Sequence, residues 1–98
     1  MIEIRQTPEY EKWFVTLKDR LARVRVDIRV RRLSLGNLGA VEPVGEGVSE
    51  LKIDHSPGYR VYFARHGNRC VLLLAGGDKS TQARDIKKAK ELARKYAE

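Results

Sequence analysis

The chain has 98 residues, which is the size of one domain and too short for a two-domain enzyme. Its hydrophobic content of 42% is too high for a disordered segment, and its net charge of +7 favours a polyanion such as nucleic acid as partner. A single cysteine, Cys70, excludes an internal disulfide framework and a cysteine-rich zinc site. The longest apolar run, 71–75, is far below the roughly 20 residues of a membrane span. With no signal-peptide stretch at the amino terminus, we expect a cytoplasmic protein that does not contact a membrane.

The first third of the chain predicts a strand and two helices. Residues 2–5 alternate apolar and polar side chains, as a half-buried strand does, and Thr7 and Pro8 then suit the start of a helix. The apolar stripe expected for this helix comprises Tyr10, Trp13, Phe14, Leu17 and Leu21. The alternation over 23–31 fits a strand as well as a helix. We favour a helix because an apolar stripe at helical spacing continues to a stop at Gly36-Asn37. That stripe comprises Leu21, Val24, Ile28 and Leu35.

The remainder predicts a loop, three strands and a helix. Four glycines and a proline make 36–47 a loop. Strands over 48–54, 59–65 and 69–75 follow as a meander joined by turns, and the last is expected at the centre of the sheet because both its faces are apolar. The final helix begins at 78–81. The order β-α-α-β-β-β-α predicts one α+β domain over 1–98, with an antiparallel-rich sheet packed against helices.

Alternation along the strands collects cations on one face of the predicted sheet. Arg60 and Tyr62 share a face, and Lys52 joins them if Leu51 points to the core. Metal-free RNA cleavage needs fixed cations for the phosphorane together with a base and an acid, and arginine is a planar bidentate donor for phosphate. The alternative is that Arg60 and Lys52 are solvated charges on an exposed sheet face. The residues after the expected central strand, at one end of the same surface, are Lys79, Arg84 and Asp85.

Other kinds of site find little support in the sequence. His55 and His66 lie beside predicted turns without a third ligand at zinc spacing, so we expect no metal. Ser80 and Thr81 fit helix caps better than nucleophiles. The segment 76–81 lacks the glycine spacing of a phosphate loop, which excludes nucleotide hydrolysis of that kind, and we expect no cofactor.

Two basic stretches, 18–32 with net charge +5 and 79–98 with net charge +4, add candidate nucleic-acid contacts. Either could be only a solvated helix face. Two such faces on so small a chain favour a large polyanion, such as a ribosome, that contacts several sides. The residues that we expect to bind nucleic acid are Arg23, Arg29, Arg31, Lys87 and Lys88.

Four segments together carry a family resemblance: LSLGNLG at 33–39, GVSELKI at 47–53, PGYRVY at 57–62, and LLAGGDKSTQ at 73–82 with RDI at 84–86. With these motifs the chain resembles the addiction-module killer proteins, the HigB/RelE-like group of the RelE/ParE toxin superfamily. The resemblance implies a RelE-like fold and a type II toxin that cleaves messenger RNA in the ribosomal A site without a metal, which inhibits translation. It also implies a cognate antitoxin that covers the active surface. We expect this antitoxin to be a helix-turn-helix protein, so that the complex binds operator DNA.

The resemblance also implies roles for individual residues. By matching position, Arg60 would hold the scissile phosphate, Lys52 would act in proton transfer or charge stabilisation, and Lys79 would take the place of a cation after the central strand. The tyrosine of the best-known branch has no counterpart at Asp85, although Tyr62 is predicted nearby.

The general acid is therefore unassigned. Asp85 would serve if its pKa were raised, or it stabilises the helix start or pairs with Arg84. Two other functions stay open: a ParE-like poison of DNA gyrase, and a non-catalytic basic module that binds nucleic acid. We favour the ribonuclease because Lys52, Arg60 and Lys79 are all present.

Overall fold

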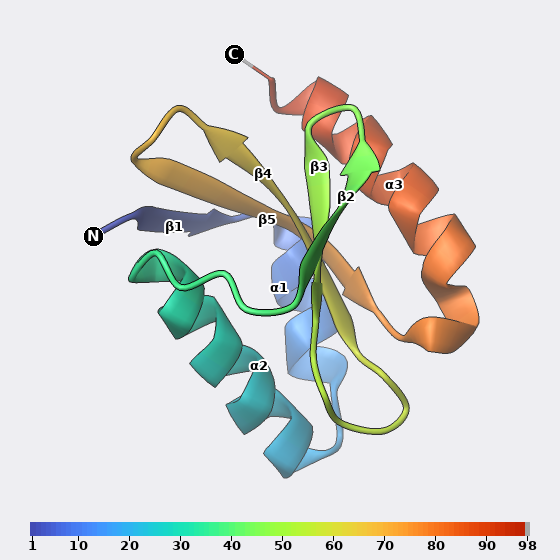
Figure 1. Cartoon of the computed structure of the whole chain (residues 1–98). Helices are drawn as coiled ribbons and strands as arrows, with labels where there is room; N and C mark the ends of the chain where they lie inside the picture. Colours follow the sequence, from blue (N-terminus) through green and yellow to red (C-terminus); the bar gives the residue numbers. More distant parts are fainter. Residues whose placement is uncertain (98) are drawn as a thin grey trace.

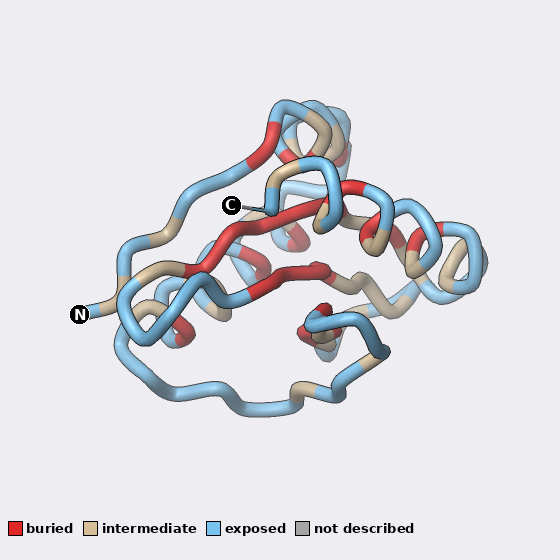
Figure 2. Tube along the Cα trace, turned by 90° about the horizontal axis from the view of Figure 1, so that it is seen from above, coloured by how far each residue is buried: buried red, intermediate tan, exposed pale blue. Residues whose placement is uncertain are grey.

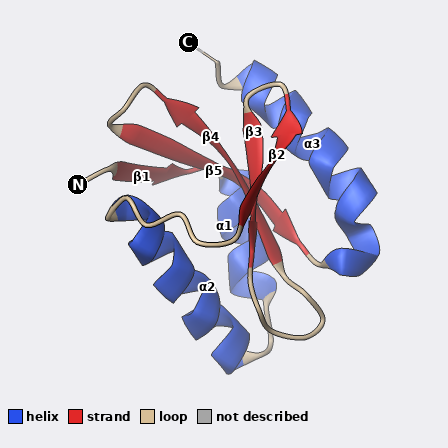
Figure 3. Cartoon of the chain, in the orientation of Figure 1, coloured by secondary structure: helices blue, strands red, loops and turns tan. Residues whose placement is uncertain are grey.

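A computed structural model, which describes residues 1–97, has one five-stranded sheet with helices on both faces (Figures 1 and 3). The elements in order are β1 (Glu3–Gln6), α1 (Pro8–Thr16), α2 (Arg20–Ser34), β2 (Val41–Gly45), β3 (Val48–Lys52), β4 (Arg60–His66), β5 (Cys70–Gly77), the short 3₁₀ helix η1 (Lys79–Thr81) and α3 (Gln82–Lys95). The α+β class is confirmed. None of the helices described is long and apolar enough to cross a membrane.

The sheet has the strand order β1-β5-β4-β3-β2, in which only β1 and β5 run parallel. The predicted meander is confirmed as β3-β4-β5, and β5 lies inside the sheet between β1 and β4. The expected loop over 36–47 was wrong for Val41–Gly45, which forms β2 and pairs with β3. Pro43 and Gly45 are typical of loops, so the sequence pattern does not indicate this strand. An edge strand tolerates the missing proline donor, and the register shifts between these two residues.

Two hydrophobic cores lie on opposite faces of the sheet (Figure 2). Helices α1 and α2 cover the face that carries Leu51, Val61 and Phe63, whereas α3 covers the face that carries Tyr62 and Ala64. Buried segments therefore run through the middle strands in Figure 2. The face of β4 that was considered as a solvated surface is covered by α3, and only its two ends, at Arg60 and His66, are accessible to solvent.

Helix α2 is confirmed as a helix, but it turns the opposite side to the core. Asp19 caps it by accepting hydrogen bonds from the backbone of Leu21 and Ala22. The stripe expected in the core is 44–60% exposed: Leu21, Val24, Ile28 and Leu35. The buried residues are Ala22, Val26 and Leu33. The alternating sequence makes both sides of the helix apolar, so periodicity does not choose between them. Leu21 also belongs to this helix and not to α1, which ends at Thr16.

Candidate functional site

Three predicted catalytic residues meet at one end of the sheet. Lys52 and Arg60 are directly opposite each other where β3 and β4 pair, and Gly77 of β5 is opposite Arg60 on its other side. A Cβ added at Gly58 would lie 3.2 Å from Arg60 Nη1 and 3.5 Å from Lys79 Cβ. The turn before β4 thus brings the start of η1 next to Arg60. The common face of Lys52 and Arg60, which alternation predicted, is confirmed by this register.

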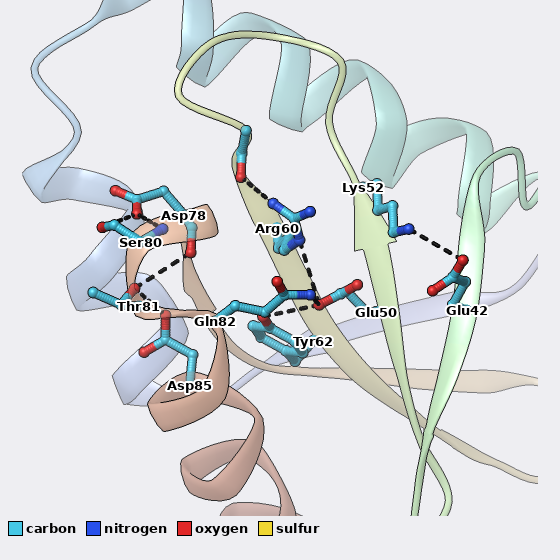
Figure 4. Close-up of polar contacts among 11 residues, drawn as sticks. Glu42, Glu50, Lys52, Arg60, Tyr62, Asp78, Ser80, Thr81, Gln82 and Asp85 are labelled. Carbon is cyan, nitrogen blue, oxygen red and sulfur yellow. Dashed lines mark hydrogen bonds and ion pairs between the residues drawn. The ribbon is translucent and has the colours of Figure 1, made fainter.

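Arg60 is a fixed and largely buried cation (Figure 4). Its side chain is 12% exposed, its Nη1 donates a 2.6 Å hydrogen bond to the Gly58 carbonyl, and its Nε lies 3.4 Å from Glu50 Oε2. Lys52 differs, because its ammonium is 3.1 Å from Glu42 of β2 and both side chains are well exposed. Exposed ion pairs contribute little and exchange with water or another anion. The site thus contains one cation that is held in place, Arg60, and one cation whose acidic partner is replaceable, Lys52.

Glu50 is the acceptor at the centre of the site. Its side chain is 1% exposed, and its Oε2 accepts hydrogen bonds from Tyr62 Oη at 3.1 Å and Gln82 Nε2 at 2.8 Å while it faces Arg60 (Figure 4). Sequence reasoning gave no role to Glu50 or Gln82. Alternation contained a signal for Glu50, which shares a strand face with Lys52 and pairs in register with Tyr62. Gln82 reaches Glu50 because α3 packs on the sheet, and no local sequence pattern predicts this packing.

Tyr62 contributes by holding Glu50. The ring is completely buried between the sheet and α3, and burial, with the Glu50 carboxylate as the next cause, raises the pKa of the phenol. Tyr62 therefore stays protonated and donates its hydrogen bond. A side chain so enclosed does not reach solvent, and the supporting role of Tyr62 in the site stays a prediction.

The start of α3 forms the other wall of the site. Asp78 accepts hydrogen bonds from the backbone and hydroxyl of Ser80, and the hydroxyl bond is the main cause that lowers the pKa of Asp78. Asp85 is buried and accepts a hydrogen bond from Thr81, and its carboxylate is 3.8 Å from Arg84. The pairing of Asp85 with Arg84 is thus present, whereas a proton-transfer role for Asp85 stays a prediction.

The residues predicted to bind nucleic acid do not form one surface. Arg29 donates to the carbonyls of Lys52 at 2.6 Å and Leu38 at 3.0 Å, so its guanidinium braces the end of β3. Arg23 donates to the carbonyl of Leu17 at the start of α2. The other three side chains are exposed: Arg31, Lys87 and Lys88. Because α2 and α3 lie on opposite faces of the sheet, contact with nucleic acid through both stays a prediction.

Over residues 1–97 no group of three or more histidine, cysteine or acidic side chains is arranged to hold a metal ion. His55 instead lies 2.9 Å from Asp19. Chemically, the site offers the preoriented guanidinium of Arg60, the ammonium of Lys52 and the exposed Lys79 at one end of the sheet. Such a set suits a phosphodiester that gains negative charge during a reaction.

Comparison with known proteins identifies the family. Residues 12–98 match the family described as phage derived protein Gp49-like. An uncharacterized protein of Haemophilus influenzae is 45% identical over 92 residues, covering 94% of this chain and 93% of that protein. A chain of the intact E. coli RelBE toxin–antitoxin complex superposes with a TM-score of 0.65 at 17% identity, covering 80% of this chain and 96% of that one. A free E. coli RelE double mutant gives a TM-score of 0.66 at 16% identity, covering 89% and 96%. The chain therefore belongs to the Gp49-like family and has the RelE fold that its sequence motifs implied.

Proposed function

We propose that the chain is the toxin of a type II toxin–antitoxin pair and that it cleaves messenger RNA on the ribosome without a metal, which inhibits translation. The observation that carries this proposal is Arg60, a guanidinium held by Glu50 and the Gly58 carbonyl beside Lys52. Support also comes from the fold, which is shared with the E. coli toxin RelE. We further propose a cytoplasmic location and a cognate antitoxin, as in the RelBE complex, through which operator DNA is bound.

In the proposed reaction the ribose 2′-hydroxyl loses its proton to water and its oxygen attacks the adjacent phosphorus. A 2′,3′-cyclic phosphate forms, the bond to the 5′ oxygen breaks, and the 5′-hydroxyl leaves with a proton. Arg60 binds the non-bridging oxygens, because its geometry is set before substrate arrives and requires no reorganisation. Lys52 exchanges Glu42 for the phosphate and stabilises the phosphorane or transfers a proton. Lys79 adds positive charge from the far side of the Gly58 turn.

The test is induction in cells of the wild-type chain, Arg60→Ala and Arg60→Lys, with messenger RNA 5′ ends mapped within translated frames. We expect cleavages in codon register that vanish in Arg60→Ala and stay low in Arg60→Lys, since lysine keeps the charge but loses the planar donor. Arg65→Ala, an exposed cation at the other end of β4, is the matched control and should keep wild-type cleavage. Thermal unfolding of each purified variant verifies its fold.

Other results would assign another function. Growth arrest with DNA damage and no new RNA ends would identify a gyrase poison of the ParE kind. Salt-sensitive RNA binding without arrest or cleavage would leave a basic nucleic-acid-binding module. Wild-type cleavage by a folded Arg60→Ala variant would refute the assignment of the site.

A further inference from the structure

A cleft of about 520 Å³ lies between α1 and the start of α3, at the end of β5. This volume is within the range of about 300–1,000 Å³ that small-molecule sites occupy. The lining residues used below are Glu9, Lys12, Trp13, Gly76, Arg84 and Lys88. The cleft is separate from Arg60 but next to it, because Gly76 lines the cleft and its neighbour Gly77 pairs with Arg60.

The indole of Trp13 is a rigid wall of this cleft. It packs directly over Gly76, where an added Cβ would overlap the ring. Tyr10 and Tyr59 also contact it, with ring centroids 5.7 Å and 6.4 Å away. The side chain is still half-buried and borders the opening. A fixed aromatic ring that lines a cleft is the kind of surface on which an unpaired base packs.

Charge around the cleft suits one nucleotide. Three exposed cations from two helices line it, namely Lys12, Arg84 and Lys88, and these suit phosphate. Asp85 also lines the cleft and lies 3.8 Å from Arg84, so a phosphate would share Arg84 with this carboxylate. Glu9 supplies the complementary feature, because its Oε1 is buried and makes no hydrogen bond within the part of the chain that the structure describes. A buried acceptor without a donor is costly, so a ligand that brings an N–H group gains from this oxygen once a small shift of the Glu9 side chain opens it to the cleft.

That acceptor selects among bases. Cytosine, adenine and guanine present exocyclic amino groups, from which a carboxylate accepts readily. Uracil presents a single imide N–H flanked by two carbonyl oxygens, whose lone pairs repel a carboxylate. An acidic peptide would meet the cations but would place further negative charge beside Glu9. The cleft therefore fits a nucleotide with an amino-bearing base better than it fits a protein segment.

We propose that this cleft is a nucleotide subsite, which takes one unpaired, amino-bearing base of the RNA against Trp13 while Lys12, Arg84 and Lys88 bind its backbone. The identity of the ligand as RNA rests on the proposed function. In this arrangement the strand passes the end of β5, from Arg60 on the α3 side to Trp13 on the α1 side. The subsite adds affinity and base preference next to the scissile phosphate.

Trp13 is the single tryptophan, so its fluorescence reports on the cleft directly. The probes are 2′-O-methyl hexanucleotides of cytidine and of uridine, which lack the attacking hydroxyl and cannot be cleaved. We expect the cytidine hexamer to quench Trp13 and to bind several-fold more tightly than the uridine hexamer. Measured by anisotropy with a labelled probe, Trp13→Ala should weaken cytidine binding about fivefold or more, and Trp13→Phe much less.

Matched variants separate the contributions. Lys88→Ala should weaken both hexamers, Glu9→Gln should reduce the difference between them, and Arg65→Ala on the far end of β4 should change neither. Thermal unfolding shows whether a variant is folded. If Trp13→Ala does not fold, Trp13→Phe, which retains a ring over Gly76, replaces it in the binding comparison. Equal affinity of the Trp13→Phe, Trp13→Ala and wild-type proteins, or equal binding of the two hexamers, would overturn the proposal.

Two further outcomes keep this inference distinct from the proposed function. Quenching by the hexamers, together with no new RNA 5′ ends in cells that express the wild-type chain, would retain the subsite and reject the ribonuclease. Arg60-dependent cleavage in cells, without any quenching of Trp13 by the hexamers, would retain the ribonuclease and reject the subsite. Quenching by a hexaglutamate peptide and not by the hexamers would show an acidic protein partner at this cleft and would also overturn the proposal.

Discussion

Removal of the Glu50 carboxylate tests whether Arg60 is positioned by a buried charge. In Glu50→Ala, Arg60 at 12% exposure loses its counter-ion, and two donors, Tyr62 and Gln82, lose their acceptor. Breaking a buried pair from one side costs about 3–5 kcal/mol. Arg60 keeps its bond to Gly58 and the pair is 3.4 Å apart, so we expect the lower end of this range. For a domain of this size, about 3 kcal/mol corresponds to a fall in Tm of about 12–24 °C.

The assay is urea unfolding followed by circular dichroism, with Tm as a second measurement. Glu50→Gln, which keeps the shape and one acceptor oxygen, should cost about 1–2 kcal/mol. Glu42→Ala is the control: it removes the exposed partner of Lys52 and should cost less than about 1 kcal/mol. Arg60→Ala completes a double-mutant cycle, in which the double variant should be more stable than the sum of the single losses predicts. Strict additivity, or equal costs for Glu50→Ala and Glu42→Ala, would refute the reasoning.

Three further predictions test the fold around the site. Leu33→Ala should cost about 2–5 kcal/mol in urea unfolding and Leu35→Ala less than about 0.5 kcal/mol, since Leu33 is buried and Leu35 is 60% exposed; the reverse order would mean that α2 faces the other way. Gly77→Ala should lower the free energy of unfolding by about 1–3 kcal/mol, because the Asp85 carboxylate of α3 occupies the position of the new Cβ. An unchanged Tm would contradict this packing of Asp85 against Gly77. The hydrogen bond from His55 lowers the pKa of Asp19 below the ordinary value of 3.8 for a free carboxyl group. The ionised Asp19 carboxylate therefore stabilises the folded state at pH values above 3.8, and this stabilisation is lost as the pH falls through the lowered pKa. The Tm difference between wild type and Asp19→Asn should therefore narrow on acidification, and a constant difference would exclude the ion pair.

The elements that could be predicted from the sequence are those with local determinants. Thr7 accepts a hydrogen bond from the Tyr10 backbone and Pro8 follows it, as the start signals of α1 indicated. Gly67 adopts positive φ at the tight turn between β4 and β5. Strand β2 lacks such a determinant, because it is stabilised through its pairing with β3, a contact between segments that local rules treat separately.

The same division holds for the site. A period of two is enough to place Lys52 and Arg60 on one face, so alternation predicted their juxtaposition. Burial of that face could not be predicted, since it depends on the docking of α3 over Tyr62. The same docking brings Gln82 to Glu50, so that a charged residue of β3 becomes a buried acceptor that faces Arg60.

Helix α3 links the stability of the fold to the geometry of the site. Gln82, at its first turn, binds Glu50, and Glu50 in turn faces Arg60. An interaction that loosens the start of α3 would therefore release Arg60 without touching it, because the carboxylate would lose a donor and gain access to water. Lys52 would keep its position, since Glu42 and the bond from Arg29 to its carbonyl come from other elements. Substitutions at Gln82 should consequently reduce the contribution of Arg60 and leave that of Lys52 intact.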